Sequence, residues 1–138
     1  MNKYLLDTNV VSELRKRRPH GAVLAWFRSL REDQIYLSAV TAGELQAGIE
    51  LTRTQDPRKA DEIERWLDQV AEAYPILPME APCFREWGRL MHGKADELIE
   101  DGMIAATARV HGLVIATRNE ADFRLLGVEI FNPFKHGS

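Results

Sequence analysis

Hydrophobic residues recur along the chain with two different spacings, which alternate from one end to the other. Short apolar runs rich in β-branched and aromatic residues predict buried strands. Segments whose apolar residues stand three and four positions apart predict amphipathic helices between these strands. The expected strands are 4–6, 35–37, 76–77, 113–117 and 128–131. The expected helices are 10–14, 19–30, 41–51, 57–74, 84–91, 96–111 and 123–126.

Residues with special backbone preferences mark where these helices begin and end. Side chains that accept hydrogen bonds from free helix amides are expected as N-terminal caps at Asn9, Thr41 and Asp56. The prolines expected in the first turn of a helix are Pro19 and Pro57. Gly112 follows the helix expected over 96–111, at the position where a left-handed residue often ends a helix. Leu51 is expected on the inward face of its helix.

The alternation of strands and helices predicts an α/β fold of three layers, with a mostly parallel central sheet flanked by helices. We expect a single domain over residues 1–138, because no linker or internal repeat interrupts the pattern. Ile76 and Leu77 stand between Pro75 and Pro78, so this strand should lie at a sheet edge, where missing amide donors are tolerated. In such sheets, functional sites form at the carboxyl ends of the strands.

The composition is that of an ordinary globular protein of 138 residues, of which 45% are hydrophobic and 28% charged. Cys83 is the only cysteine, which excludes an internal disulfide and a paired-thiolate zinc site. The apolar run that ends at Asp7 is too short for a signal-peptide core or a membrane span. These observations favour a protein of the reducing cytoplasm with no membrane attachment.

The formal net charge is −3, so the surface as a whole does not favour binding to nucleic acid. Any contact with RNA must be local, and the densest basic run is Arg15, Lys16, Arg17 and Arg18. The same run also suits the solvated C-terminus of a helix, where cations complement the helix dipole. The sequence leaves both interpretations open.

Two acidic residues stand near the ends of the first two strands, and each has a structural alternative. Asp7 directly follows the first strand and should lie at the carboxyl edge of the sheet, although an aspartate here also serves as a helix cap. Glu44 lies one turn into the helix after the second strand and should face the same edge. However, Thr41 and Glu44 also match a capping box, in which the glutamate returns to the cap residue.

Further acids fall in the C-terminal part of the chain. Asp101 belongs to an acidic stretch that complements a helix dipole, but its apolar neighbours indicate that it needs a buried partner such as a cation. After strand 113–117, Asn119 and Asp122 are alternative members of the same cluster, and Asn119 also suits a helix cap. Acids that converge cannot all remain ionised unless a cation lies among them. Oxygen ligands without cysteine or paired histidines suit Mg²⁺ or Mn²⁺ rather than zinc.

Four motifs in this order resemble those of PIN-domain ribonucleases, specifically the VapC and FitB toxins. They are Leu5-Leu6-Asp7-Thr8-Asn9-Val10, Leu37 to Leu45, Asp101 to Ala108, and Ala116 to Asn119 with Asp122-Phe123. The resemblance implies catalytic and metal-binding roles for Asp7, Glu44, Asp101 and Asp122. The implied auxiliary residues are Asn9, Thr117, Arg118 and Asn119. Some relatives carry an acid at the position of Asn119, so the fourth ligand is open between Asn119 and Asp122.

The resemblance also implies an activity and partners. Mg²⁺, or Mn²⁺, would activate a water for hydrolysis of an RNA phosphodiester and leave 5′-phosphate and 3′-hydroxyl ends. VapC-like proteins usually form homodimers and are neutralised by a VapB- or FitA-like antitoxin, so DNA would be contacted only through the antitoxin. The apolar residues of the early helices and of helix 56–74 are either candidates for these interfaces or ordinary core. Arg118 is expected to hold an RNA phosphate or an antitoxin carboxylate.

The same residues also bear on other functions. A phosphotransfer receiver domain is disfavoured because it requires adjacent acids after its first strand, where Asp7 stands alone. A haloacid-dehalogenase-type phosphatase is disfavoured because it requires an aspartate where Asn9 stands. A catalytically inactive PIN-like module that binds RNA or protein is the more serious alternative. DNA as the substrate is also open, because the hydrolysis chemistry does not choose between RNA and DNA.

Overall fold

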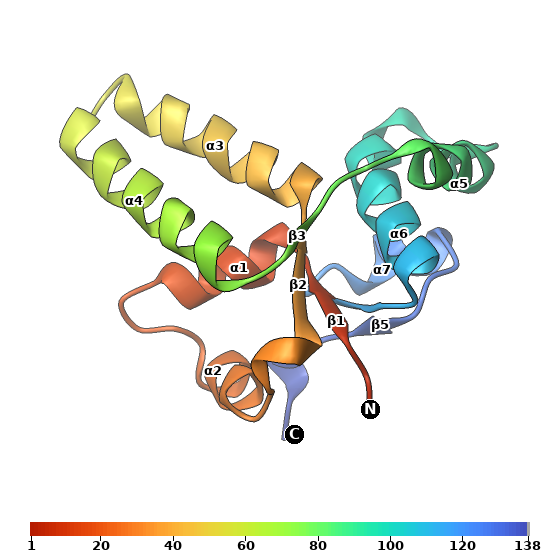
Figure 1. Cartoon of the computed structure of the whole chain (residues 1–138), viewed down its shortest axis with the longest axis horizontal. Helices are drawn as coiled ribbons and strands as arrows, with labels where there is room; N and C mark the ends of the chain where they lie inside the picture. The colour runs from red at the N-terminus through yellow and green to blue at the C-terminus, as the bar shows by residue number, and fades with distance from the viewer. Residues whose placement is uncertain (138) are drawn as a thin grey trace.

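The computed structural model describes residues 1–137, in which five strands form one parallel sheet (Figure 1). The strands are β1 (Tyr4–Leu6), β2 (Ile35–Ser38), β3 (Ile76–Leu77), β4 (Val114–Ala116) and β5 (Ile130–Phe131). Their order is β3-β2-β1-β4-β5, so the chain moves outward from β1 in one direction and returns to its other side at β4. This confirms the parallel sheet, and it places the short strand β3 at an edge as predicted.

Helices cover both faces of this sheet (Figure 1). One face carries α1 (Thr8–Arg15), α2 (Gly21–Arg28) and α4 (Pro57–Ala73), and the other carries α5 (Ala81–Met91), α6 (Ile99–His111) and α7 (Glu120–Leu125). Helix α3 (Ala39–Arg53) pairs with α4, and this hairpin projects away from the sheet. Short 3₁₀ turns are η1 (Glu32–Gln34), η2 (Asp96–Leu98) and η3 (Pro133–Lys135). No helix among residues 1–137 is long and apolar enough to span a membrane.

Alternate residues of the strands feed two separate hydrophobic clusters, because successive side chains of a strand point to opposite faces. Leu5 and Ile115 belong to the cluster under α5, α6 and α7. Leu6 and Ala116 belong to the cluster under α1 and α2, which α4 completes. The core is therefore divided by the sheet, and the expected three-layer arrangement is confirmed.

Two of the expected helix caps are wrong, and both errors have the same cause. The cap of α1 is Asp7 rather than Asn9, and Asp7 Oδ1 accepts a hydrogen bond of 2.8 Å from the Thr8 amide. The cap of α3 is Ser38 rather than Thr41, and Ser38 Oγ accepts from the Thr41 amide at 3.0 Å. In each case the last extended residue at the end of a strand takes the capping position, so the helix begins earlier than predicted.

The other helix boundaries follow the sequence more closely. Asp56 caps α4 through the Lys59 amide, and Gly112 ends α6 with a φ angle of +67°. Helix α2 begins at Gly21 rather than at Pro19, since the His20 ring accepts from the Ala22 amide. Leu51 is 74% exposed, so its expected inward placement on α3 is wrong.

Candidate active site

Asp7 lies at the carboxyl end of β1, where the strand order reverses, and its carboxylate is buried. Besides capping α1, the carboxylate accepts through Oδ2 from Thr117 Oγ1 at 2.7 Å and from Asn9 Nδ2 at 3.2 Å. Burial raises the pKa of Asp7, and the hydrogen bonds from Thr117 and Thr8 only partly oppose this rise. Asp7 is thus a cap and also a buried, hydrogen-bonded acid at the switch point of the sheet.

Glu44 faces Asp7 from the first turns of α3. Its Oε1 accepts a hydrogen bond of 2.7 Å from Thr8 Oγ1, and the Thr8 hydroxyl also lies 3.0 Å from that of Thr41. The capping-box interpretation of Glu44 is therefore wrong, because its carboxylate is bound across to α1. Burial raises the pKa of Glu44, with smaller contributions from contact with Glu100 and from the charge of Asp7, while the Thr8 hydrogen bond lowers it.

Asp101 approaches the same edge from the first turn of α6. Burial is the largest cause that raises the pKa of Asp101 to about 6, and the charges of Asp7, Asp122 and Glu100 add to it. The side-chain amide of Asn119 donates to Asp101 Oδ2 at 3.3 Å and to Asp122 Oδ2 at 2.9 Å. Asn119 precedes α7 but makes no side-chain capping hydrogen bond, so it joins two acids instead of capping the helix.

The structure therefore brings together all the acids that the sequence singled out. Thr117 is fully buried and forms the floor beside Asp7, as the resemblance implied. Two neighbours were not assigned from the sequence, namely Thr8, which binds Glu44, and Glu100, whose charge reaches Glu44 and Asp101. Thr8 could have been found, because a hydroxyl beside Asp7 in a strand-to-helix turn is free to bind a facing acid.

Arg118 directly follows Thr117, but its side chain turns away from the acids and toward Phe134. Its guanidinium carbon lies 3.7 Å from the centre of the Phe134 ring. Its backbone amide donates to Asn9 Oδ1 at 3.3 Å, which links the loop after β4 to α1. The basic run occupies the end of α1 and the loop after it, and within it Lys16 pairs with Glu13 at 2.9 Å.

The oxygen ligands of the cluster suit a hard divalent cation, although the side chains are spaced widely in this structure. Among residues 1–137, no three histidine, cysteine, aspartate or glutamate side chains lie close enough together to hold a metal ion. The clustered ligands offer carboxylate, hydroxyl and amide oxygen, which suits Mg²⁺ or Mn²⁺. Burial is the largest cause that raises the pKa values of Asp7, Glu44 and Asp101, and the charges of neighbouring acids add to the rise at Glu44 and Asp101.

Comparisons with known proteins agree with this geometry. The family model of the PIN domain matches residues 4–128. Toxin FitB of Neisseria gonorrhoeae is 37% identical to the chain, with 94% of this chain and 97% of the relative covered. VapC ribonuclease Y4jK of Sinorhizobium fredii is also 37% identical, with 95% and 97% covered. The solved structure of FitAB bound to an IR36 DNA fragment aligns with a TM-score of 0.84 at 33% identity, with 98% and 99% covered.

Proposed function

The chain belongs to the PIN domain family, and from that membership we propose that it is a metal-dependent endoribonuclease that acts as the toxin of a toxin–antitoxin pair. The observation that carries the proposal is the convergence of four acids at one edge of the sheet, Asp7, Glu44, Asp101 and Asp122. The similarity to a toxin and to a ribonuclease over nearly the whole chain supports it. Cleavage of cellular RNA places this activity in the cytoplasm.

The four acids would hold Mg²⁺, or Mn²⁺, with Asp122 as the fourth ligand. When bound, the ion supplies Lewis acidity that lowers the pKa of the attacking water and neutralises charge on the phosphate. A carboxylate of the cluster near the bound ion would accept the proton of that water. Thr8 orients Glu44, and Thr117 and Asn9 orient Asp7. Because water is the nucleophile, the products carry 5′-phosphate and 3′-hydroxyl ends.

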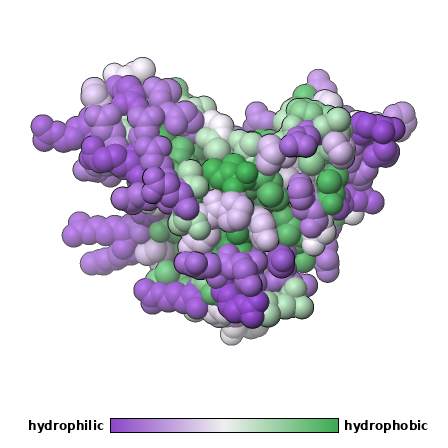
Figure 2. Space-filling view, viewed as in Figure 1, coloured by the Kyte–Doolittle hydropathy of each residue, from purple (hydrophilic) through white to green (hydrophobic). Residues whose placement is uncertain are grey.

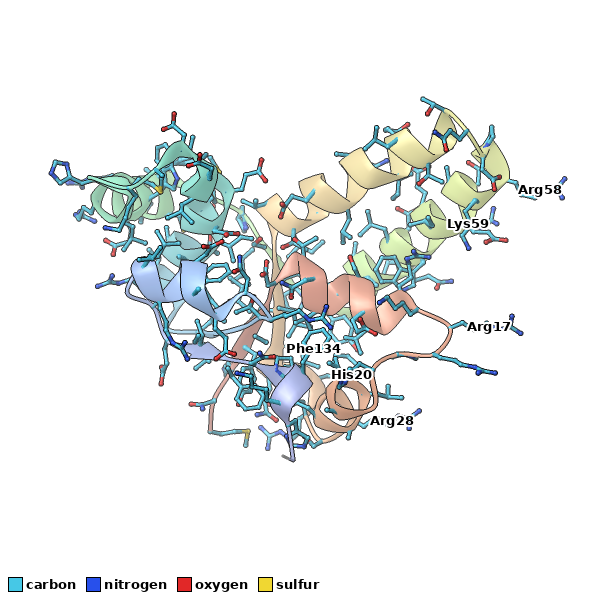
Figure 3. All side chains as sticks on the ribbon, turned by 180° about the vertical axis from the view of Figure 1, so that it is seen from behind. Arg17, His20, Arg28, Arg58, Lys59 and Phe134 are labelled. Carbon is cyan, nitrogen blue, oxygen red and sulfur yellow. The ribbon has the colours of Figure 1, made fainter. Side chains whose placement is uncertain are left out.

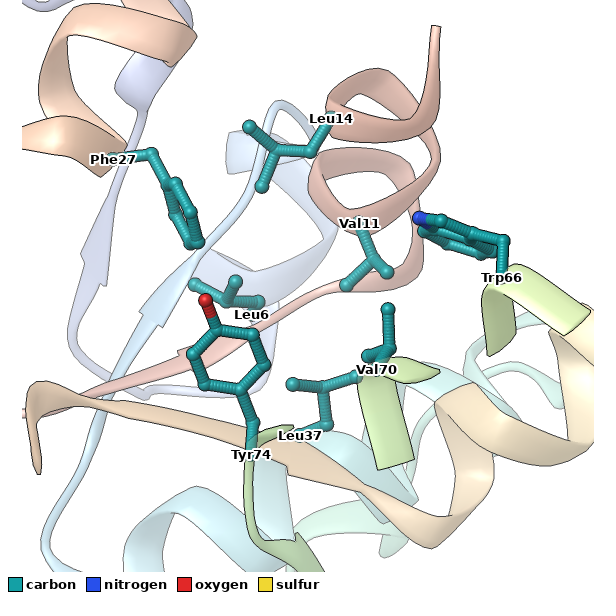
Figure 4. Close-up of a pocket in the computed structure, with 8 residues that line it drawn as sticks. All are labelled: Leu6, Val11, Leu14, Phe27, Leu37, Trp66, Val70 and Tyr74. Carbon is teal, nitrogen blue, oxygen red and sulfur yellow. The ribbon is translucent and has the colours of Figure 1, made fainter. Parts of the chain in front are cut away.

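An apolar groove between α1, α2 and α4 is the proposed site of an antitoxin of the VapB or FitA type. It has a volume of about 200 Å³ and is open between side chains of the early helices and of α4 (Figure 4). The residues at its mouth are Leu14, Phe27, Trp66, Val70 and Tyr74. A groove of this kind accepts the apolar face of a partner helix. Contact with DNA would then pass through the antitoxin, and the similar FitAB complex has been solved bound to a DNA fragment.

A second hollow supports the proposed homodimer. It lies between the α3–α4 hairpin and helices α5 and α6, where apolar surface is exposed (Figure 2). Val40, Ala47 and the exposed Leu51 line it together with Glu44. Burial of this surface against a second copy would remove Leu51 from water.

The test combines growth with the mapping of RNA ends. Wild-type protein, Asp7→Asn and Asp101→Asn are each expressed from an inducible promoter, with Asp68→Asn, an exposed carboxylate on α4, as the matched control. We expect arrest and discrete new 5′-phosphate ends with the wild type and with Asp68→Asn only. RNA that is bound but not cleaved at any Mg²⁺ concentration would instead support the inactive binding module.

A further inference from the structure

The acidic cluster creates an electrostatic problem for the RNA strand that it would cleave. The net charge of the chain is −3, and the carboxylates at the sheet edge add repulsion where the scissile phosphate must lie. Phosphates on either side of that point would be repelled as well. A strand is therefore held only if nearby cations bind its flanking phosphates.

Arg118 is a cation that is prepared for such a contact. It directly follows Thr117, the floor residue that binds Asp7, and its guanidinium is stacked on the Phe134 ring. No carboxylate among residues 1–137 forms an ion pair with Arg118, although the charge of Arg118 acts on the Glu13 carboxylate at longer range. An arginine held flat on a ring loses little freedom when its planar donors bind two phosphate oxygens.

The last turn of the described chain fixes Phe134 in this position. The Phe134 amide donates to Asn132 Oδ1 at 3.0 Å, and Asn132 Nδ2 donates to Glu120 Oε2 at 2.9 Å. Lys135 also pairs with Glu120, at 2.6 Å. Turn η3 is thus tied to the start of α7, and the ring beneath Arg118 is held by contacts outside the acidic cluster.

From Phe134, a series of contacts leads to the basic end of α1. The Phe134 and His20 rings meet edge to face at 5.3 Å, and their side chains point toward each other in Figure 3. The His20 amide donates to Glu13 Oε2 at 2.9 Å, and Lys16 pairs with the same carboxylate. Arg17 follows Lys16 in sequence and projects outward (Figure 3). Both line a hollow whose opposite wall carries Lys59 of α4.

We propose that the RNA strand flanking the scissile phosphate lies along a cationic track formed by Arg118, Lys16 and Arg17 around the His20 ring, with Phe134 as the positioning residue for Arg118. The proposal rests on the ribonuclease function and adds the path of the substrate. An RNA strand fits better than an acidic protein segment because Arg118 directly follows Thr117, which binds Asp7 of the acidic cluster.

The test measures binding of RNA separately from its cleavage. A short fluorescein-labelled single-stranded RNA spanning a mapped cleavage site is titrated with the full chain in EDTA, from about 50 to about 200 mM salt. We expect Arg118→Ala to weaken binding about tenfold and to reduce the slope of log K against log salt by about 0.7, the loss of one phosphate contact. In Mg²⁺, Arg118→Ala should raise KM more than it lowers kcat.

Matched variants separate the track from general effects of charge and folding. Phe134→Leu should weaken binding in the same direction as Arg118→Ala, whereas Phe134→Tyr, which keeps the ring, should restore it. Arg31→Ala removes one exposed charge at the opposite edge of the sheet and should leave the salt slope unchanged. Arg17→Ala should lower the slope of log K against log salt without affecting the contact between Arg118 and Phe134.

Each remaining outcome overturns the proposal in a distinguishable way. RNA cleavage with unchanged affinity and slope in Arg118→Ala and Arg17→Ala would overturn the track and leave the ribonuclease function standing. If a polyglutamate peptide binds the wild type but not Arg118→Ala, while binding of RNA is unaffected, the surface belongs to an acidic protein partner. If the wild type neither binds nor cleaves RNA, the track and the proposed function both fail.

Discussion

Crowding of like charges has its clearest effect on Asp101, the half-buried acid of the first turn of α6. Its ordinary pKa is 3.8, and burial followed by the charges of its acidic neighbours raises it to about 6. In the absence of metal, the folded protein therefore retains a proton on Asp101 at a pH where the unfolded chain has lost it. By linkage, stability is present below the unfolded pKa and is lost as pH rises through the folded value.

This linkage predicts how an asparagine at position 101 changes stability with pH. Well below pH 3.8, Asp101→Asn and the wild type should have similar free energies of unfolding, because the wild-type carboxyl is then protonated in both states. Above pH 6 the variant should be more stable by roughly 1 kcal/mol, a figure already reduced for solvent screening at a half-buried site. Urea unfolding in EDTA at about pH 3 and about pH 7.5 measures the difference. Asp68→Asn is the control, and an equal gain in that variant would contradict the explanation.

Thr8 allows the orientation of an acid to be tested without removal of the acid. Thr8→Val keeps the shape of the side chain but removes the hydroxyl that donates to Glu44 at 2.7 Å. We expect about a tenfold lower kcat and a higher Mg²⁺ requirement, since a supporting hydrogen bond to a metal ligand has an effect of this order. Thr8→Ser, which keeps the donor, should stay close to the wild type. Cleavage rates across a Mg²⁺ series measure the effect, and identical curves for valine and serine would refute it.

At the level of elements, the sequence predicted the strands and the helix order well, because buried runs and helical spacing are local patterns. Strand β1 was predicted at its observed bounds, and the caps Asp56 and Gly112 were identified. Asp7 was expected as one of two possible caps of α1, whereas Ser38, the cap of α3, was not expected, and the difference has a physical reason. Asn9 and Thr41 both suit a capping position. Neither acts as a cap, because the extended segment before each of them already ends at Asp7 or Ser38, and that residue caps the helix.

The double role of Asp7 leads to a prediction about helix α1. Asp7→Asn should keep the cap and remove a buried charge, but it loses the hydrogen bonds that Oδ2 accepts from Thr117 and Asn9. Asp7→Ala loses the cap as well and should be about 1 kcal/mol less stable than Asp7→Asn. Both variants should be inactive in RNA cleavage. Thermal unfolding followed by circular dichroism measures the stabilities, and equal stabilities would show that the carboxylate does not support α1.

At the level of the whole molecule, the family and the three-layer fold were predicted correctly, whereas the internal geometry of the site was not. The comparisons confirm the resemblance that four motifs had indicated. Sequence spacing does not show that Thr8 binds Glu44, 36 positions away, or that Asn119 joins Asp101 to Asp122. Sequence spacing also does not show which way the Arg118 side chain points. These contacts depend on how strands distant in sequence are paired. The roles of the acids in catalysis and metal binding remain predictions.

Binding of a cation to the acidic cluster should be visible in the stability of the whole molecule without any RNA. Saturating Mg²⁺ should raise the free energy of unfolding of the wild type by about 1 to 3 kcal/mol, because the ion binds only the folded arrangement of acids. Asp101→Asn should show a clearly smaller gain. Differential scanning fluorimetry measures this, with KCl at matched ionic strength as the control. The same shift with KCl would mean that screening of charge, not a bound ion, is responsible.

The tip of the α3–α4 hairpin, around residues 50–60, has few supports beyond the two helices themselves. A small cluster of Ile49, Ala60 and Leu67 joins them, and the Arg53 guanidinium binds three carboxylates near the tip. Amide hydrogens around 50–60 should therefore exchange with deuterium earlier than those of β1 and β4, and added salt should speed this exchange by screening the Arg53 pairs. Hydrogen-exchange mass spectrometry would resolve the two regions. Because Glu44 is anchored at the opposite end of α3, local opening of the tip leaves the acidic edge of the sheet folded.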